Sequence, residues 1–188
     1  TIDIYIIFMA SFNSVTDLKE YMVEEYYNGP PNPEAEQALI LGFFDTQDYN
    51  LVLLMLEKGC PITEELKEKC ISSFNLILYQ FLCPKHLELS TKLMNKVCKN
   101  GNLELVKWLW SKDCPRDAHV CARAAIGGNL EVLKWLRSKG CPCNKDIIIY
   151  AAEKGHLDII EWARSNGCPW DQWVCILAAR WGHLEILK

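Results

Sequence analysis

The sequence predicts an all-α fold, a solenoid of stacked helix–turn–helix units. The first observation is a block of fifteen residues, GNLEVLKWLRSKGCP from Gly128 to Pro142, with near-copies that begin at Gly101 and Gly155 and a truncated copy at Gly182. The second is that leucine recurs at a fixed interval, and the third is that Cys-Pro closes the unit at the same interval. The in-phase leucines are Leu76, Leu103, Leu130, Leu157 and Leu184, which define a 27-residue period. A unit this short cannot bury its apolar face alone, so neighbouring units must stack.

Each unit is predicted to contain two helices, of which the second is the longer. In the unit that starts at Asn129, the segment from Leu130 to Leu136 places apolar side chains at helical spacing. Asn129 is a favoured N-cap whose side-chain oxygen would accept a main-chain N–H, and Gly128 suits the left-handed residue that ends the preceding helix. Gly140 ends the second helix, and Asp113, which tolerates a left-handed conformation, replaces it in one copy.

The first helix of each unit is predicted to be shorter and to end in a pair of alanines. The aligned segments are VCARAA (residues 120–125), IIIYAA (147–152) and VCILAA (174–179). Because alanine is small, two helices can approach closely there. His156 and His183 take the place that Asn129 holds, and we expect them to cap helices and to hydrogen-bond between units.

The N-terminal part departs from this pattern. Residues 1–33 are predicted to hold a divergent helix pair, over 4–22, and the proline-rich linker YYNGPPNP, over 26–33, whereas residues 34–188 form the repeat array. In the unit from Leu66 to Cys83, Cys-Pro comes four residues early, which predicts a short second helix. We expect six complete helix pairs and a truncated seventh.

The chain begins without methionine and stops inside a repeat, so we expect it to be part of a longer protein. A stack of repeats needs a polar end to stay soluble. We therefore expect Trp181, Ile186 and Leu187 to be exposed unless further chain covers them.

The phrases AAIGGNLEVL, AAEKGHLDII and AARWGHLEIL resemble the ankyrin repeat, in particular the short Gly-Cys-Pro variety found in large DNA viruses and some protists. The resemblance covers residues 36–188. It implies an elongated helical array that binds other proteins and has no catalytic residues of its own. The usual ankyrin unit is longer, at about 33 residues, and carries T-P-L-H before the alanines. Here the unit is six residues shorter, so we expect short turns without long β-hairpin fingers.

Composition and charge argue against two partner classes, nucleic acid and membrane. The chain has 188 residues, of which 50% are hydrophobic and 23% charged, and a net charge of −4. Residues 1–94 carry 6 basic against 14 acidic side chains, and residues 95–188 carry 14 against 10. These scattered cations do not favour nucleic acid. The longest apolar run, from Ile4 to Ala10, is too short to span a membrane.

The ten cysteines are predicted to be reduced. Cys60, Cys114, Cys141 and Cys168 all precede proline at the same repeat position. In stacked units such equivalent positions lie about 8–10 Å apart, whereas a disulfide needs Cα atoms within about 7 Å. Reduced thiols favour a cytoplasmic location, which is the host cytoplasm if the chain is viral.

Three sets of residues invite a chemical interpretation, and a structural role explains each of them better. Cys141 and Cys143 with a nearby histidine lack the paired spacing of a zinc site. The in-phase histidines have no nucleophile and carboxylate repeated beside them. The Gly127-Gly128 pair is not followed by the Gly-Lys-Ser/Thr of a phosphate loop. We therefore predict no enzyme activity, no metal, no cofactor and no small-molecule ligand.

Seven tryptophans stand out. The in-phase set, which we expect in the core, is Trp108, Trp135 and Trp162. The out-of-phase set is Trp110, Trp170, Trp173 and Trp181. The shared core explains the second set less well, and tryptophan is enriched at binding hot spots.

The sequence thus predicts a non-catalytic protein–protein interaction module. Its candidate contacts vary between units on the first helix and its following turn, and they are Lys99, Arg123, Tyr150, Lys154, Arg180 and Trp181, with the turn residues Arg116, Asn144 and Trp170 beside them. The alternative is that these are simply solvated positions. Two other functions remain open, a structural or virion-associated repeat protein and the substrate-binding part of a ubiquitin-ligase adaptor.

Overall fold

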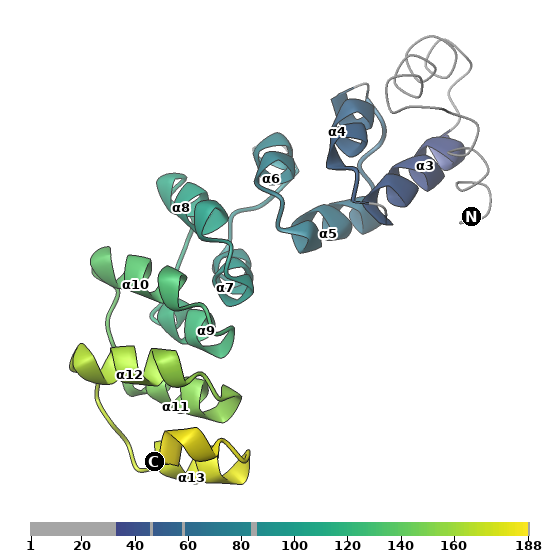
Figure 1. Cartoon of the computed structure of the whole chain (residues 1–188). Coiled ribbons are helices and arrows are strands. Elements are labelled where there is room, and N and C mark those ends of the chain that lie inside the picture. The colour runs from purple at the N-terminus through teal and green to yellow at the C-terminus, as the bar shows by residue number, and fades with distance from the viewer. Residues whose placement is uncertain (1–32, 46, 58, 84–85, 188) are drawn as a thin grey trace. The chain divides into compact units, whose positions relative to one another are not determined.

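A computed structural model describes residues 33–45, 47–57, 59–83 and 86–187 (Figure 1). Within these ranges the chain forms eleven α-helices and one 3-10 helix and contains no strand, which confirms the predicted all-α class. The helix pair predicted over residues 4–22 lies outside the described residues. So does the predicted linker, except for Pro33, which begins the first described helix.

The chain divides into two compact units, Thr1–Leu87 and Glu88–Lys188. The described helices of the first unit are α3 (Pro33–Asp45), α4 (Tyr49–Glu57), α5 (Glu64–Ser73) and α6 (Leu76–Leu82). Helix α3 packs against α4, and α6 packs against both α4 and α5. Helix α6 is shorter than the second helices of the later pairs, as the early Cys-Pro predicts.

In the second unit the helices alternate between two rows (Figure 1). The first row consists of α7 (Thr91–Asn100), α9 (Val120–Ile126), α11 (Lys145–Lys154) and α13 (Trp173–Arg180). The second row consists of α8 (Leu103–Ser111), α10 (Leu130–Ser138) and α12 (Leu157–Ser165), and the 3-10 helix η2 (Leu184–Leu187) follows α13. Each first-row helix packs against the next one in its row, and α8 packs against α10. Every second-row helix begins at one of the in-phase leucines, so the period of the sequence is the period of the fold.

Two or three residues separate each first-row helix from its second-row partner, so the two helices of a pair run antiparallel. The predicted left-handed residues lie where the helices end. Gly128 has a φ of 73° and Gly140 a φ of 86°. Asp113, in the place of that second glycine, has a φ of 53°, which confirms that it substitutes for glycine there.

In the second unit the core consists of aliphatic residues from both rows, together with alanines near the ends of first-row helices. In α10 the fully buried side chains are Val132, Leu133 and Leu136. The alanine pairs Ala124-Ala125 and Ala151-Ala152 are also fully buried, as small residues at close helix contacts should be.

The three in-phase tryptophans are a correction to the sequence prediction. Trp108, Trp135 and Trp162 are half-buried and do not belong to the core. The aliphatic residues beside them on the same helices fill it instead. A half-buried tryptophan keeps part of its ring available to neighbours at the surface.

Candidate partner-binding surface

Two opposite edges of the second unit hold most of the candidate contacts. We call one the glycine-turn edge, formed by the turns within helix pairs at residues 101–102, 127–129, 155–156 and 181–183 and by the last turns of the first-row helices that lead into them. The other is the Cys-Pro edge, formed by the segments between pairs at 112–119, 139–144 and 166–172 and by the last turns of the second-row helices that lead into them. Because the helices of a pair run antiparallel, the two edges lie a helix length apart.

The nine candidate residues therefore do not form one site. At the glycine-turn edge are Lys99, Lys154, Arg180 and Trp181, and at the Cys-Pro edge are Arg116, Asn144 and Trp170. Arg123 and Tyr150 lie between the edges, on the middle of the first-row helices α9 and α11. All of them are exposed except Tyr150 and Asn144, which are half-buried.

The glycine-turn edge brings two candidates together across neighbouring pairs. The Lys154 ammonium lies 6.0 Å from the centre of the Trp181 ring. It also forms an ion pair of 2.9 Å with Glu153. Trp181 itself is 55% exposed, so most of its ring is open to solvent beside a cation.

A ladder of side-chain hydrogen bonds fixes this edge. Asn129 donates from Nδ2 to the main-chain oxygens of Cys98 and Lys99, at 3.1 and 2.8 Å. At the equivalent positions His156 Nε2 lies 3.4 Å from the Ile126 oxygen, and His183 Nε2 lies 3.1 Å from that of Glu153. These bonds confirm the predicted hydrogen bonding between units.

The predicted capping role of Asn129 is wrong. Its side chain makes no cap hydrogen bond, whereas Asn102, one unit earlier, accepts one from the Leu105 amide at 3.0 Å. His156 likewise makes no cap bond. The side chain of Asn129 instead turns back to the carbonyl groups at the end of α7, which lack partners within their own helix.

The Cys-Pro edge carries a cluster of cations and tryptophans. The Arg116 guanidinium lies 3.9 Å above the centre of the Trp110 ring. Trp110 meets Trp135 of the next second-row helix edge-on, with ring centres 5.3 Å apart. The Lys139 ammonium lies 5.6 Å from the Trp135 ring. The sequence named Arg116 as a candidate contact and set Trp110 apart as an out-of-phase tryptophan. It did not predict that Trp110 meets Trp135, because the two residues are not equivalent by the repeat and come together only in space.

The other two candidates of this edge differ in character. Trp170 is exposed, and the Arg164 guanidinium lies 4.9 Å above its ring. Asn144 is half-buried and its Nδ2 donates to Asp146 at 3.2 Å. Trp170 is therefore placed to meet a partner, whereas Asn144 belongs to the start of α11.

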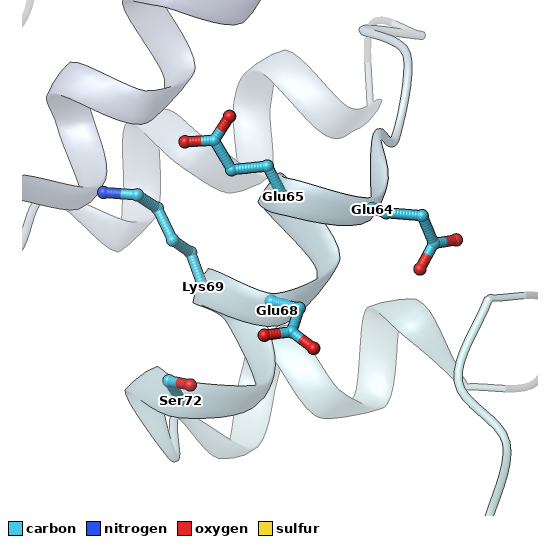
Figure 2. A pocket seen from close by; sticks show the side chains of 5 residues that line it. All are labelled: Glu64, Glu65, Glu68, Lys69 and Ser72. Atoms are coloured by element: carbon cyan, nitrogen blue, oxygen red, sulfur yellow. The ribbon is translucent and has the colours of Figure 1, made fainter.

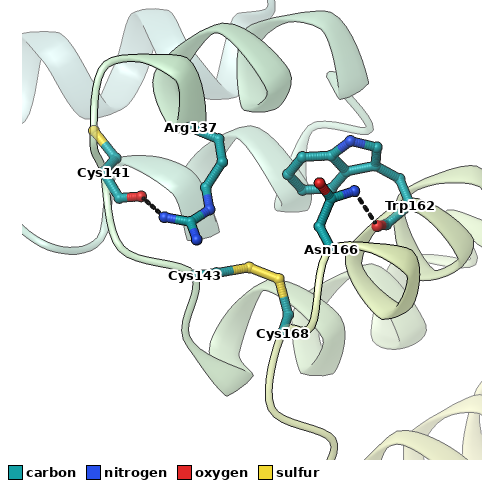
Figure 3. The surroundings of a disulfide bond; sticks show 6 residues. All are labelled: Arg137, Cys141, Cys143, Trp162, Asn166 and Cys168. Carbon is teal, nitrogen blue, oxygen red and sulfur yellow. Dashed lines mark hydrogen bonds between the residues drawn. A yellow bond between two sulfur atoms is a disulfide. The ribbon is translucent and has the colours of Figure 1, made fainter.

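Two cysteines of the Cys-Pro edge form a disulfide that the sequence did not predict. Cys143 and Cys168 are joined across neighbouring turns, with Cα atoms 5.4 Å apart (Figure 3). The spacing argument applied only to equivalent positions, and Cys143 lies two residues beyond Cys141. Around the bond, Arg137 donates to the Cys141 oxygen at 2.9 Å (Figure 3). That the thiols are reduced in the cell stays a prediction.

The other eight cysteines are not in a disulfide. Burial raises the pKa of the Cys98 thiol to about 12 and that of Cys60 to about 11. Cys141 differs from these two, because a hydrogen bond from the Cys121 thiol lowers its pKa and Arg116 adds to the effect. Buried thiols with raised pKa values are poor nucleophiles.

The last first-row helix exposes a face that its predecessors cover. Ala152 of α11 is fully buried, whereas Ala179, at the equivalent position of α13, is exposed. Trp181 and Leu187 are exposed as predicted, and Ile186 is half-buried. The outer face of α13 is thus an apolar surface without a helix against it in the described chain.

In the first unit, α5 bears a hollow lined by Glu64, Glu65, Glu68, Lys69 and Ser72 (Figure 2). Figure 2 shows the Glu65 and Lys69 side chains extending to the same side of the helix. Glu64 forms an ion pair of 3.5 Å with Lys67. This arrangement is an acidic, solvated helix face.

Among the described residues, no group of three or more His, Cys, Asp or Glu side chains is placed to hold a metal ion. None of the described helices combines the length and the apolar composition that crossing a bilayer requires. No protein-family model matches the chain, and no curated protein matches it either.

Proposed function

We propose that the chain is a non-catalytic protein–protein interaction module, a solenoid of short ankyrin-like repeats that works in the cytoplasm. The shared period of sequence and fold supports this proposal, as do the antiparallel pairs and the rows in which they pack. A stack of this kind offers an extended surface to a partner.

The observation that carries the proposal is a constant core beside a variable surface. In the first row, Ala124 and Ala151 occupy the same repeat position and are both fully buried. The residue just before each alanine differs, being exposed Arg123 in α9 and half-buried Tyr150 in α11. The scaffold is therefore repeated while the side chains that it presents change from unit to unit, as selective recognition requires.

The hydrogen-bond ladder gives that surface a fixed geometry. Asn129, His156 and His183 each connect their own glycine turn to the end of the first-row helix in the preceding pair. A surface that is already ordered loses little conformational entropy on binding. We infer that the contacts lie on the first row and at the glycine-turn edge, where Lys99, Lys154, Arg180 and Trp181 lie.

Site-specific photocrosslinking tests the proposal. A photoreactive phenylalanine analogue is placed at Arg123 or Tyr150, and in matched controls at Lys134 or Glu161, which are exposed in the middle of the second-row helices α10 and α12. The chain is irradiated in an extract of the cells that express it. We expect one protein adduct of constant mass from positions 123 and 150 and none from the controls.

The same experiment separates the alternatives. Adducts between copies of the chain itself would support the structural-component function, which the apolar face of α13 favours. Equal adducts at all four positions, or none at 123 and 150, would remove the first row as the binding surface.

A further inference from the structure

The Cys-Pro edge is unusually rich in cations without carboxylate partners. Its exposed basic residues are Lys112, Arg116, Arg137, Lys139 and Arg164. Within the described part of the chain, none of the five forms an ion pair. Arg116 and Arg137 donate to the main-chain oxygens of Cys114 and Cys141, at 3.5 and 2.9 Å.

The acidic residues of this edge are mostly engaged in helix starts. Asp117 accepts from the His119 amide at 2.9 Å, and Asp171 accepts from the Trp173 amide at 3.1 Å. Asp171 also pairs with Lys145 at 3.6 Å. The five cations outnumber the three carboxylates of the edge, Asp113, Asp117 and Asp171, so the edge keeps a net positive charge.

The opposite ends of the second-row helices are different. Glu104 pairs with Lys107 at 2.7 Å, and Glu131 pairs with Lys134 at 2.8 Å. Carboxylates gather at the helix starts and unpaired cations at the helix ends. This polarity suits the helix dipole, but the dipole does not explain why tryptophans lie under the cations.

The tryptophans hold the cations in place. Arg116 lies above Trp110, Lys139 faces Trp135, and the two rings contact each other across neighbouring pairs. One repeat further along, Arg164 of α12 lies above Trp170, which is in the segment that follows this helix. An arginine on a ring face keeps its N–H groups available to a carboxylate in a restricted orientation.

We propose that the Cys-Pro edge binds an extended acidic segment of a partner protein. The inference rests on the proposed function, because it takes the chain to be a protein-binding module, but it assigns a second surface and the chemistry of its ligand. Each stacked guanidinium offers a two-pronged hydrogen bond that matches a carboxylate.

The repeat sets the register of the ligand. Equivalent points on packed helices lie about 8–10 Å apart. An extended chain in the polyproline II conformation advances about 3.1 Å per residue and completes a turn every three residues, so side chains three residues apart point to the same side. A carboxylate at every third residue therefore meets the cations of successive pairs. A segment with the same acidic residues in one block would reach only one pair at a time.

Single-stranded nucleic acid fits this edge less well. It needs open aromatic faces on which bases stack. Arg116 covers a face of Trp110, and Arg164 covers a face of Trp170. The rings are thus occupied by cations that present hydrogen-bond donors.

Fluorescence anisotropy with labelled probes tests the proposal on the intact chain. One probe is a thirteen-residue peptide of Glu at every third position among Gly and Ser, the second has the same composition with all Glu adjacent, and the third is an oligothymidylate. We expect the periodic peptide to bind at least about tenfold tighter than the blocked one, because charge-assisted contacts at separate pairs add. Binding should weaken as salt rises.

Matched variants locate the site. Arg116→Glu should weaken binding of the periodic peptide about tenfold. Lys134→Glu makes an equal charge change at an exposed residue whose ammonium pairs with Glu131 toward the opposite end of α10, and should leave binding within about twofold. Trp110→Leu keeps the charge but removes the ring beneath Arg116, and should weaken binding several-fold. Circular dichroism and thermal melting show that each variant is folded.

Three results would overturn the inference. They are equal loss of binding in the Arg116 and Lys134 variants, no preference for the periodic peptide, and tighter binding of the oligothymidylate. If photocrosslinks form at positions 123 and 150 but the peptide does not bind, the proposed function holds and only the assignment of an acidic-segment site to the Cys-Pro edge is wrong. If the peptide binds but no photocrosslinks form at those positions, the first row is not the binding surface and the Cys-Pro edge remains one.

Discussion

The side-chain amide of Asn129 donates a hydrogen bond to the main-chain oxygen of Lys99, 2.8 Å away in the preceding helix pair. The bond joins the glycine turn of one pair to the helix end of another, and it recurs with histidine two more times along the row. Each pair is therefore stabilised by its neighbour through polar contacts as well as apolar packing.

Removing this side chain should destabilise the second unit. In Asn129→Ala the oxygens of Cys98 and Lys99 lose a donor in a half-buried site, and we expect a loss of about 1–3 kcal/mol in the free energy of unfolding. Urea denaturation followed by circular dichroism measures it. Asn129→His, the residue used at the next two positions, should recover part of the loss, and a melt of Asn129→Ala like that of the parent would show that the ladder contributes nothing.

Two glycines allow the cost of a left-handed backbone to be measured separately from the cost of a close side-chain contact. Both Gly128 and Gly140 have positive φ, but a Cβ on Gly128 would lie 2.7 Å from the His156 ring, whereas a Cβ on Gly140 would meet nothing within 4 Å. Gly140→Ala should cost about 1–2 kcal/mol of stability, and Gly128→Ala about 1–3 kcal/mol more.

The double variant Gly128→Ala with His156→Ala checks the cause in the same thermal melts. Once the His156 ring is removed, the stability lost through Gly128→Ala, measured relative to His156→Ala alone, should be close to that lost through Gly140→Ala in the parent. Equal penalties for the two single substitutions would mean that the ring moves aside freely.

The period of the sequence was enough to predict the rows of helices, because each in-phase leucine of the second unit begins the second helix of a pair. The residues that end helices were also predictable, since Asp113 and Gly128 take the left-handed conformation that a helix end requires. The short helix α6 followed from the early Cys-Pro. These features depend only on residues close in the chain.

Contacts between neighbouring pairs were harder to predict, because they join residues that are not equivalent. Asn129 has the features of an N-cap in its own helix, yet the carbonyl groups of α7 attract its amide. Trp110 meets Trp135, and Cys143 meets Cys168, at separations of 25 residues in both cases. A search for partners at the repeat period passes over such pairs.

The outer face of α13, which the described helices leave exposed, leads to a prediction with a matched control. Ala152 and Ala179 are equivalent by the repeat, but only Ala152 is buried. Ala152→Glu should destabilise the unit by several kcal/mol, since it buries an unpaired charge. Ala179→Glu should change stability by less than about 0.5 kcal/mol, and urea denaturation of both variants measures the difference.

A strong loss of stability in Ala179→Glu would show that the outer face of α13 is covered in solution. Retained stability in Ala152→Glu would contradict the packing of α13 against α11. Both variants carry the same chemical change, so differences between them report only their surroundings.

The Cys143–Cys168 pair predicts that stability depends on redox conditions. The bond closes a loop with a sequence separation of 25 residues, and a crosslink of that length stabilises by about 3 kcal/mol in the chain-entropy account. Adding dithiothreitol should therefore lower the melting temperature of the oxidised parent. Cys143→Ala should melt at the reduced value in either buffer, and Cys175→Ser, which alters an exposed cysteine outside the bond, should behave as the parent does.

A buried thiol makes stability fall at high pH. Burial raises the pKa of Cys98 to about 12, whereas an unfolded thiol titrates at about 8.5. Below the unfolded value both states hold the proton, so the contribution of the thiol is fully present. As pH rises toward 12, the unfolded chain releases its proton and the folded chain keeps it, so the free energy of unfolding decreases, by up to about 1.4 kcal/mol per pH unit for one group. Urea denaturation at pH 7.5, 9.5 and 10.5 should show a shallower decline in Cys98→Ala than in the parent. Parallel declines would mean that Cys98 ionises as readily in the folded chain as in the unfolded one.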